Sequence, residues 1–161
     1  MDTLSLLETQ IAIKYLKDKF ESLLAKKLNL TRVSAPLFVE ESTGLNDNLN
    51  GVEKSVYFYI KDKKIEIVHS LAKWKRYALK EYDFAKYTGL YTDMNAIRKD
   101  EIMDNLHSIY VDQWDWEKVI DEKDRKLSYL FKVVNQIYSV ILKVAALSEK
   151  KWGYNYNGTR R

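Results

Sequence analysis

The chain has 161 residues, 46% hydrophobic and 31% charged, and no cysteine, which suits one globular domain and excludes disulfides and thiolate chemistry. Its net charge of +4 arises from 27 basic and 23 acidic residues that are interspersed, which favours a mixed, solvated surface, so we expect no nucleic-acid partner. The N-terminal residues lack signal-peptide features and no unbroken apolar run approaches roughly 18 residues, so we expect a cytoplasmic protein without a membrane segment.

The first elements are a long helix and a proline-containing strand region. Apolar residues recur at helical steps through the first 24 residues, which predicts a helix capped by Asp2 or Thr3 and ending near Asn29. Residues 31–39 are rich in β-forming types around the single proline, Pro36. Because proline cannot donate a hydrogen bond within a sheet, we expect Pro36 at a strand edge or a bend.

A loop, a hairpin and a shorter helix follow. Residues 41–51 carry Gly, Asn and Asp, which supply turn chemistry. Alternating apolar residues predict strands over residues 56–60 and 65–68, joined by a lysine-rich turn. Ser70 is then placed to cap a helix over residues 71–82.

The remainder predicts two strands and a second long helix. The strands cover residues 89–97 and 108–116, and the helix runs from about residue 124 to 150 with one apolar face. We assign residues 1–150 to one domain and residues 151–161, which lose all periodicity, to an irregular tail. These elements predict an α+β fold with an antiparallel sheet flanked by helices.

Arg98 ends the strand predicted over residues 89–97. A guanidinium held on a rigid strand offers a planar fork that matches phosphate or carboxylate oxygens. The alternative is a surface salt bridge with Asp100 or Glu101, and spacing alone favours that alternative.

Gln113 and Asp115 lie two residues apart within the next predicted strand. Side chains alternate across a sheet, so these two share a face while Trp114 and Trp116 point to the other. A carboxylate beside an amide can accept from an ammonium and donate to a carbonyl. The alternative is a pair of polar side chains that simply faces solvent.

Other candidate groups carry weaker signals. Asp47 lies in the Gly- and Asn-rich loop, where it closes over a ligand or caps its own turn. Residues 73–76 form the most basic cluster, and its mixture with aromatic residues suits nucleic acid but is commoner on a helix that shows solvated cations to water. His69 and His107 are far apart, which argues against a histidine metal site and against a Ser-His-Asp arrangement.

The strings GLNDNLNG, IVHS, LAKWKR, GLYTDMNAIR and LHSIYVDQWDWE occur in this order. They resemble the ammonia-dependent asparagine synthetases, the aspartate–ammonia ligase family, from the first helix to about Ser148. The tryptophan-rich blocks make the resemblance specific. It implies a class II aminoacyl-tRNA synthetase-like fold and a homodimer, with the first helix and the Pro36 strand forming the dimer motif.

The resemblance also implies an enzyme, a carbon–nitrogen ligase of asparagine biosynthesis. Aspartate would attack the α-phosphate of Mg-ATP to give β-aspartyl-AMP, and ammonia would then release asparagine and AMP. By position, Arg98 and Gln113 would be catalytic, with Gln113 at the side-chain end of aspartate. Arg98 would also be the ATP-binding residue, bridging the reacting carboxylate and the α-phosphate.

Four further positions are implied to bind aspartate. Asp47 and Asp115 would hold its α-ammonium, and Ser70 and Lys75 its α-carboxylate. No metal ligand is expected among the residues of this chain, because the family's Mg²⁺ ligands belong to a second half.

Proteins of the resembled family continue for about as long again, whereas nothing after Trp152 resembles their second half. We therefore expect a truncated chain with weak or no ligase activity. The alternative function is a non-catalytic amino-acid-binding or dimerisation module derived from the same fold.

Overall fold

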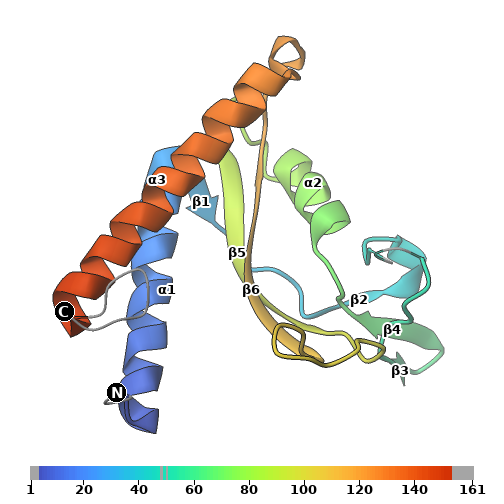
Figure 1. Cartoon of the computed structure of the whole chain (residues 1–161). Coiled ribbons are helices and arrows are strands. Elements are labelled where there is room, and N and C mark those ends of the chain that lie inside the picture. Colours follow the sequence, from blue (N-terminus) through green and yellow to red (C-terminus); the bar gives the residue numbers. More distant parts are fainter. Residues whose placement is uncertain (1–3, 48, 50, 154–161) are drawn as a thin grey trace. The chain divides into compact units, whose positions relative to one another are not determined.

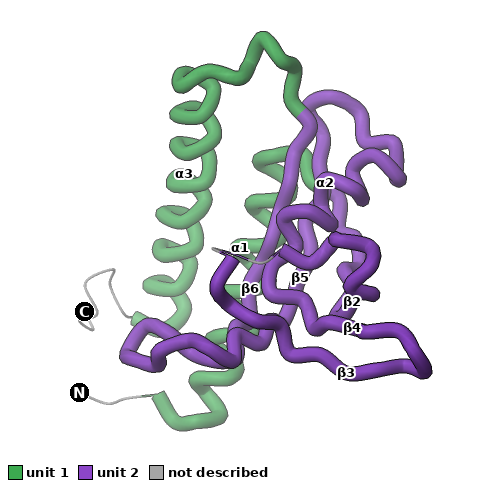
Figure 2. The backbone as a smooth tube through the Cα atoms, turned by 90° about the vertical axis from the view of Figure 1, so that its right-hand side faces the viewer, with its two compact units in different colours: residues 1–30, 120–161 green, residues 31–119 purple. Residues whose placement is uncertain are grey.

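The computed structural model describes residues 4–47, 49 and 51–153 (Figure 1). The chain divides into two compact units, residues 1–30 with 120–161 and residues 31–119 (Figure 2). Helices occur with antiparallel strand pairs, so the predicted α+β class is confirmed.

The first unit begins with helix α1 (Leu6–Leu28). Ser5 is its N-cap and forms a capping box, in which the Glu8 N–H donates to Ser5 Oγ at 3.2 Å and the Ser5 N–H to Glu8 Oε2 at 2.8 Å. The predicted caps, Asp2 and Thr3, lie outside the described residues. The helix therefore begins later than predicted, because the reciprocal box defines its first turn.

The second helix of this unit is α3 (Leu127–Trp152), which follows a short 3₁₀ turn at Glu122–Asp124. It ends at Trp152, and the next residue, Gly153, is the C-cap with a left-handed φ of 72°. Lys151 and Trp152 are therefore helical, and their assignment to the irregular tail was wrong. Residues 154–161 of that tail lie outside the described residues. The Trp152 ring meets the Tyr15 ring of α1 edge-on at 5.0 Å.

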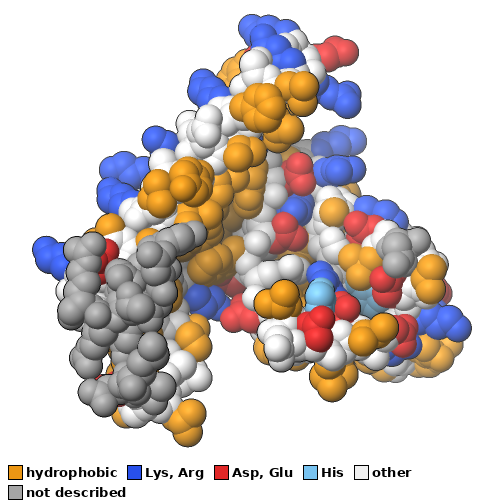
Figure 3. All heavy atoms as spheres, in the orientation of Figure 1, with side chains coloured by type: hydrophobic (Ala, Val, Ile, Leu, Met, Phe, Trp, Pro, Cys, Tyr) orange, Lys and Arg blue, Asp and Glu red, His pale blue; other side chains and the backbone are white. Residues whose placement is uncertain are grey.

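Much of the apolar face of α3 is open to solvent. Val140 and Val144 are its buried residues, whereas most of the predicted packing face is exposed (Figure 3). The exposed apolar residues are Leu127, Leu130, Phe131, Val134, Tyr138, Ile141 and Leu142. By length and composition alone α3 matches a membrane-spanning helix, with a mean hydropathy of 1.5, although Lys132 and Lys143 interrupt its apolar sequence.

The second unit contains two small sheets rather than the single one expected. In the first, β5 (Gly89–Ile97) lies between β1 (Leu30–Arg32) and β6 (Tyr110–Lys118). β5 and β6 pair antiparallel over their full nine residues, from Gly89 opposite Lys118 to Ile97 opposite Tyr110. β5 has its predicted bounds, and β6 begins two residues later than predicted.

The other sheet contains the predicted hairpin. Its central strand is β4 (Lys63–Ile67), which pairs antiparallel with β3 (Tyr57–Ile60) and with β2 (Phe38–Glu40). The turn between β3 and β4 has only two residues, and Lys61 adopts a φ of 56° there. Pro36 lies between β1 and β2, outside both strands, as its missing N–H requires.

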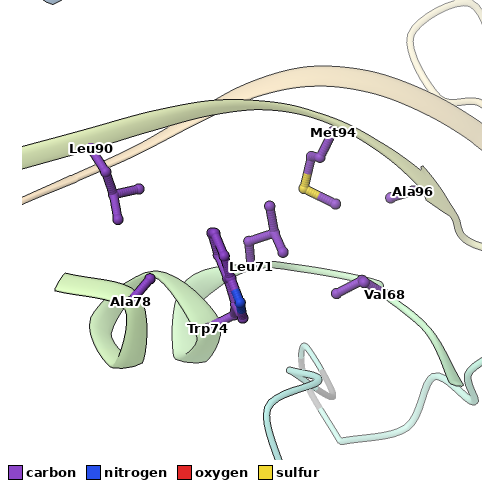
Figure 4. Packing of buried hydrophobic residues seen from close by; sticks show 7 residues of the cluster. All are labelled: Val68, Leu71, Trp74, Ala78, Leu90, Met94 and Ala96. Carbon is purple, nitrogen blue, oxygen red and sulfur yellow. The ribbon is translucent and has the colours of Figure 1, made fainter. Parts of the chain in front are cut away.

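Helix α2 (Ala72–Glu81) packs onto one face of β5 and completes the core of this unit (Figure 4). The cluster consists of Val68, Leu71, Trp74, Ala78, Leu90, Met94 and Ala96. The helical positions recur at steps of three and four and the β5 positions at steps of four and two, so each element contributes one apolar face. Burying a large aliphatic side chain stabilises the fold by about 1.5–3 kcal/mol. This packing brings the N-terminal half of α2 over the β5–β6 pair.

Candidate functional site

Gln113 and Asp115 lie on the sheet face that α2 covers. Gln113 is directly opposite Met94, and Asp115 is opposite Thr92, and both β5 partners are buried. Directly opposed residues of an antiparallel pair project to the same face. Trp114, one position between them, projects to the other face, so the predicted alternation is confirmed.

Lys75, the fourth residue of α2, reaches this face from above the sheet. Its side chain is only 7% exposed and its Nζ contacts Asp115 Oδ1, with Glu117 Oε2 at 3.8 Å and the Trp116 carbonyl oxygen at 3.1 Å. Two carboxylates thus surround one ammonium, giving this cluster a formal charge of −1. Sequence reasoning favoured a solvated cation on α2, and the structure shows a buried one.

Gln113 makes a weak contact with the neighbouring strand. Its Nε2 lies 3.1 Å from the Met94 sulfur. A thioether is a poor acceptor, so a carbonyl or carboxylate oxygen would be a better partner for the amide. Gln113 is therefore suited to meeting a polar ligand.

Arg98 continues the same ladder beyond the end of β5. Its N–H donates to the Ile109 carbonyl oxygen at 2.8 Å, and by alternation its position shares the face of Met94. The Nε is buried and has no hydrogen-bond partner among the described residues, and Nη1 lies 4.0 Å from Glu101 Oε2. The alternative ion pair with Glu101 is thus present but long. A buried, unsatisfied guanidinium nitrogen fits an anion.

The loop after the 3₁₀ turn Glu41–Thr43 carries Asp47, which is half-buried. Its neighbour Asn46 is buried, and the Asn46 Oδ1 accepts from the His69 N–H at 2.9 Å. This bond connects the Asp47 loop to the segment before α2. Nothing in the sequence pattern predicted a buried amide in this loop.

Ser70 precedes α2 and accepts from the Ala72 N–H at 3.3 Å, although Leu71 is the N-cap residue. Ser70 therefore contacts the helix start as predicted, but from one residue outside the cap. His69, beside it, is 1% exposed, and neither ring nitrogen has a hydrogen-bond partner among the described residues. The sequence spacing argued against a metal site and a Ser-His-Asp arrangement for His69, and it did not predict this burial.

The contacts join the predicted residues in two groups. Lys75, Gln113 and Asp115 gather on the β5–β6 face, while Asp47 and Ser70 are linked through the Asn46 loop. Helix α2 connects the groups, because Ser70 precedes its first turn and Lys75 lies within that turn. Arg98 stands apart from both, further along the same sheet face.

The family model described as aspartate-ammonia ligase matches residues 7–157. The chain belongs to the aspartate–ammonia ligase family. The strings that suggested this resemblance include the β5, β6 and α2 segments that build the candidate site.

Curated relatives support the assignment. The aspartate–ammonia ligase of Clostridium perfringens is 64% identical over 139 residues, which is 84% of this chain and 41% of the relative. That of Limosilactobacillus fermentum is 61% identical, over 86% of this chain and 42% of the relative. The chain therefore spans about two-fifths of the length of these relatives.

Solved structures support the fold. A pyrrolysyl-tRNA synthetase from Desulfitobacterium hafniense matches 80% of this chain and 45% of its own, with a TM-score of 0.58 and 14% identity. A histidyl-tRNA synthetase from Nostoc matches 86% of this chain and 32% of its own, also with a TM-score of 0.58. The class II aminoacyl-tRNA synthetase-like fold predicted from the sequence is thus confirmed for the part of the fold that this chain spans.

Proposed function

We propose that this chain carries the aspartate-binding part of an aspartate–ammonia ligase site. The observation that carries the proposal is the buried Lys75 ammonium between the partly buried carboxylates of Asp115 and Glu117, beside Gln113. An α-amino acid has one ammonium and one carboxylate on the same carbon, and this cluster presents both complementary charges. Its formal charge of −1 also favours a ligand that brings an ammonium into it.

Binding would exchange one ion pair for two. The ligand ammonium takes the place of Lys75 Nζ at Asp115, and the released Lys75 Nζ pairs with the ligand α-carboxylate. Asp47 supplies a second carboxylate to the ammonium, and the Ser70 hydroxyl donates to the α-carboxylate. In a site screened from water these paired charges interact more strongly than at the surface.

The order of residues along the sheet orients the ligand. Asp115 is opposite Thr92, Gln113 is opposite Met94, and Arg98 follows four residues beyond Met94 on the same face. An aspartate held by its ammonium at Asp115 therefore extends past Gln113, with its β-carboxylate towards Arg98. Gln113 donates a hydrogen bond to the side-chain end of the aspartate, and Arg98 binds its β-carboxylate and the anion that reacts with it.

That anion is the α-phosphate of ATP. A β-carboxylate oxygen attacks the phosphorus and pyrophosphate leaves; ammonia then attacks the acyl carbon, and the C–O bond to AMP breaks to give asparagine. Arg98 neutralises negative charge on the carboxylate and phosphate as they approach. ATP supplies the leaving group that a free carboxylate lacks.

Mg²⁺ accompanies ATP in this proposal, but its ligands are assigned elsewhere. No group of three or more His, Asp or Glu placed for a metal occurs in residues 4–47, 49 and 51–153. We place the Mg²⁺ ligands in the part of the relatives that this chain does not match. A cytoplasmic location and a homodimer belong to the same proposal.

Calorimetry with aspartate tests the binding step. Wild-type protein should bind aspartate, and Asp115→Asn should weaken binding at least tenfold. Asp112→Asn is the matched control, because Asp112 is on the same strand but projects to the other face. Absence of aspartate binding, or equal losses in both variants, would refute the site.

Turnover separates the two candidate functions. AMP formation that requires ATP, aspartate and ammonia together supports a ligase. Aspartate binding without AMP formation supports the non-catalytic binding module.

A further inference from the structure

Asn46 is a buried polar side chain in a surface loop. Only 5% of it is exposed, although it lies between Leu45 and Asp47 in the stretch that separates β2 from β3. Asparagine usually stays at the protein surface, and a buried amide is stable only when its donors and acceptor find partners. The burial therefore needs a structural cause.

The partners of Asn46 come from β4, from the segment before α2 and from α2 itself. Its Nδ2 donates to Glu66 Oε2 at 3.0 Å and to the Ile67 carbonyl oxygen at 3.4 Å, both on β4. Its Oδ1 accepts from the N–H of His69, the residue before Ser70, at 2.9 Å. Lys73 Nζ, in the first turn of α2, donates to the Asn46 backbone carbonyl oxygen at 3.3 Å.

These bonds use both ends of the amide. An alanine would lose the donor and the acceptor together, and an aspartate would place a second carboxylate against Glu66. The Glu66 carboxylate is itself buried and 3.5 Å from Lys64 Nζ, so the acceptor that faces Asn46 is held in place. The amide therefore fixes the loop backbone against the β4–α2 junction.

We propose that Asn46 is a positioning residue that holds the Asp47 carboxylate at a constant position relative to Ser70. It thereby sets the preference for ligands with an α-ammonium. The inference rests on the proposed function, because it concerns the same aspartate site. Asp47 follows Asn46 directly, so the anchor leaves the Asp47 backbone little freedom. Ser70 follows His69 directly, so the same hydrogen bond ties both ligand-binding positions together.

A comparison of aspartate with succinate tests this role. Succinate has the same two carboxylates but no ammonium, so it cannot use Asp47. Wild-type protein should prefer aspartate, which means that the Kd for succinate exceeds the Kd for aspartate. Asp47→Asn and Asn46→Ala should each lower the ratio of the succinate Kd to the aspartate Kd at least tenfold. The double variant should lose little more than either single variant, because both act through the same carboxylate.

A matched control and a second measurement separate positioning from general loss of structure. Asn95→Ala removes an exposed amide on the far face of β5 and should leave the ratio unchanged. In hydrogen exchange without ligand, Asn46→Ala should speed exchange of the His69 amide at least tenfold and leave the Leu90 amide unchanged.

Three results would overturn the inference. The first is a Kd ratio that is unchanged in Asn46→Ala but lowered in Asp47→Asn. The second is a loss of affinity in Asn46→Ala that is equal for aspartate and succinate. The third is an unchanged hydrogen-exchange rate of the His69 amide in Asn46→Ala. If wild-type protein binds neither ligand, the proposed function fails by itself. The hydrogen-exchange result then decides whether Asn46 is the anchor.

Discussion

The Lys75 ammonium on α2 contacts the Asp115 carboxylate on β6, although the two residues are 40 positions apart in the sequence. Their side chains are only 7% and 22% exposed. Such a pair gives little net stability, because removing both charges from water costs nearly as much as their attraction returns. It holds two complementary charges ready for a ligand that carries both.

Removing one member of this pair should destabilise the fold. Lys75→Met leaves Asp115 and Glu117 without their ammonium, and we expect the free energy of unfolding to fall by about 1–3 kcal/mol. Lys75→Met combined with Asp115→Asn should recover part of the loss, because no uncompensated charge then remains at Asp115. Urea denaturation of the single and double variants measures this. Strictly additive losses would show that the two groups do not interact.

Arg98→Ala should separate nucleotide binding from amino-acid binding. We expect ATP affinity to fall at least tenfold and aspartate affinity to fall by a smaller factor, because the ammonium and the α-carboxylate of aspartate are held elsewhere. Arg98→Lys should restore little of the loss, since an ammonium lacks the planar fork of a guanidinium. Arg32→Ala is the control, because Arg32 pairs with Asp93 at 3.4 Å on the other sheet face. Equal losses in Arg98→Ala and Arg32→Ala would contradict the assignment.

Glu66 should make stability depend on pH in the acid range. Burial acts to raise its pKa, but hydrogen bonds from Asn46 and Ser55 and the charge of Lys64 outweigh this, so the pKa lies below its ordinary value of 4.5. A lowered folded-state pKa contributes stability that is present above the unfolded pKa and disappears as the pH falls through the folded one.

Glu66→Gln should therefore flatten the stability curve. We expect a smaller decrease of the unfolding free energy between about pH 5 and pH 3 than in wild-type protein, because the variant cannot take up that proton. Denaturant titrations at several pH values measure the slope. Glu81→Gln, at an exposed carboxylate of α2, is the control. Parallel curves for wild type and Glu66→Gln would argue against the shift.

The exposed apolar face of α3 should make the protein self-associate. Leu130 and Val134 are 54% and 50% exposed and lie one turn apart on this helix. Large exposed apolar patches favour association. Replacing both residues with serine should lower the apparent mass in sedimentation and reduce binding of a hydrophobic dye. Lys143→Ser, at an exposed polar position of α3, should change neither; an equal effect there would exclude the apolar face as the cause.

Local patterns in the sequence account for much of the fold. The two-residue period placed Gln113 and Asp115 on one face and Trp114 on the other, and the bounds of β5 agree with the prediction. The helical spacing of Leu71, Trp74 and Ala78 likewise indicated α2. These features depend on neighbours within a few residues, so a periodic pattern is sufficient to reveal them.

The start of α1 and the packing of α3 were less well predicted. Ser5 rather than an earlier residue caps α1, because Glu8 lies three positions after it and closes the capping box. On α3 the apolar stripe is wider than the surface that α1 covers, so Val140 is buried while Leu130 is exposed. Periodicity shows which face is apolar, but it does not show what covers that face.

By itself the sequence determined the family, the order of helices and strands, and the residue types available for chemistry. Only the tertiary structure decided that Lys75 contacts Asp115 and that Asn46 is buried against Glu66. It also decided that Arg98 lies on the same face of the β5–β6 pair as Asp115. The physical reason is that each of these relationships depends on strand register and on helix docking between segments distant in sequence. Such relationships are determined by the packing of the whole unit, and no local repeat encodes them.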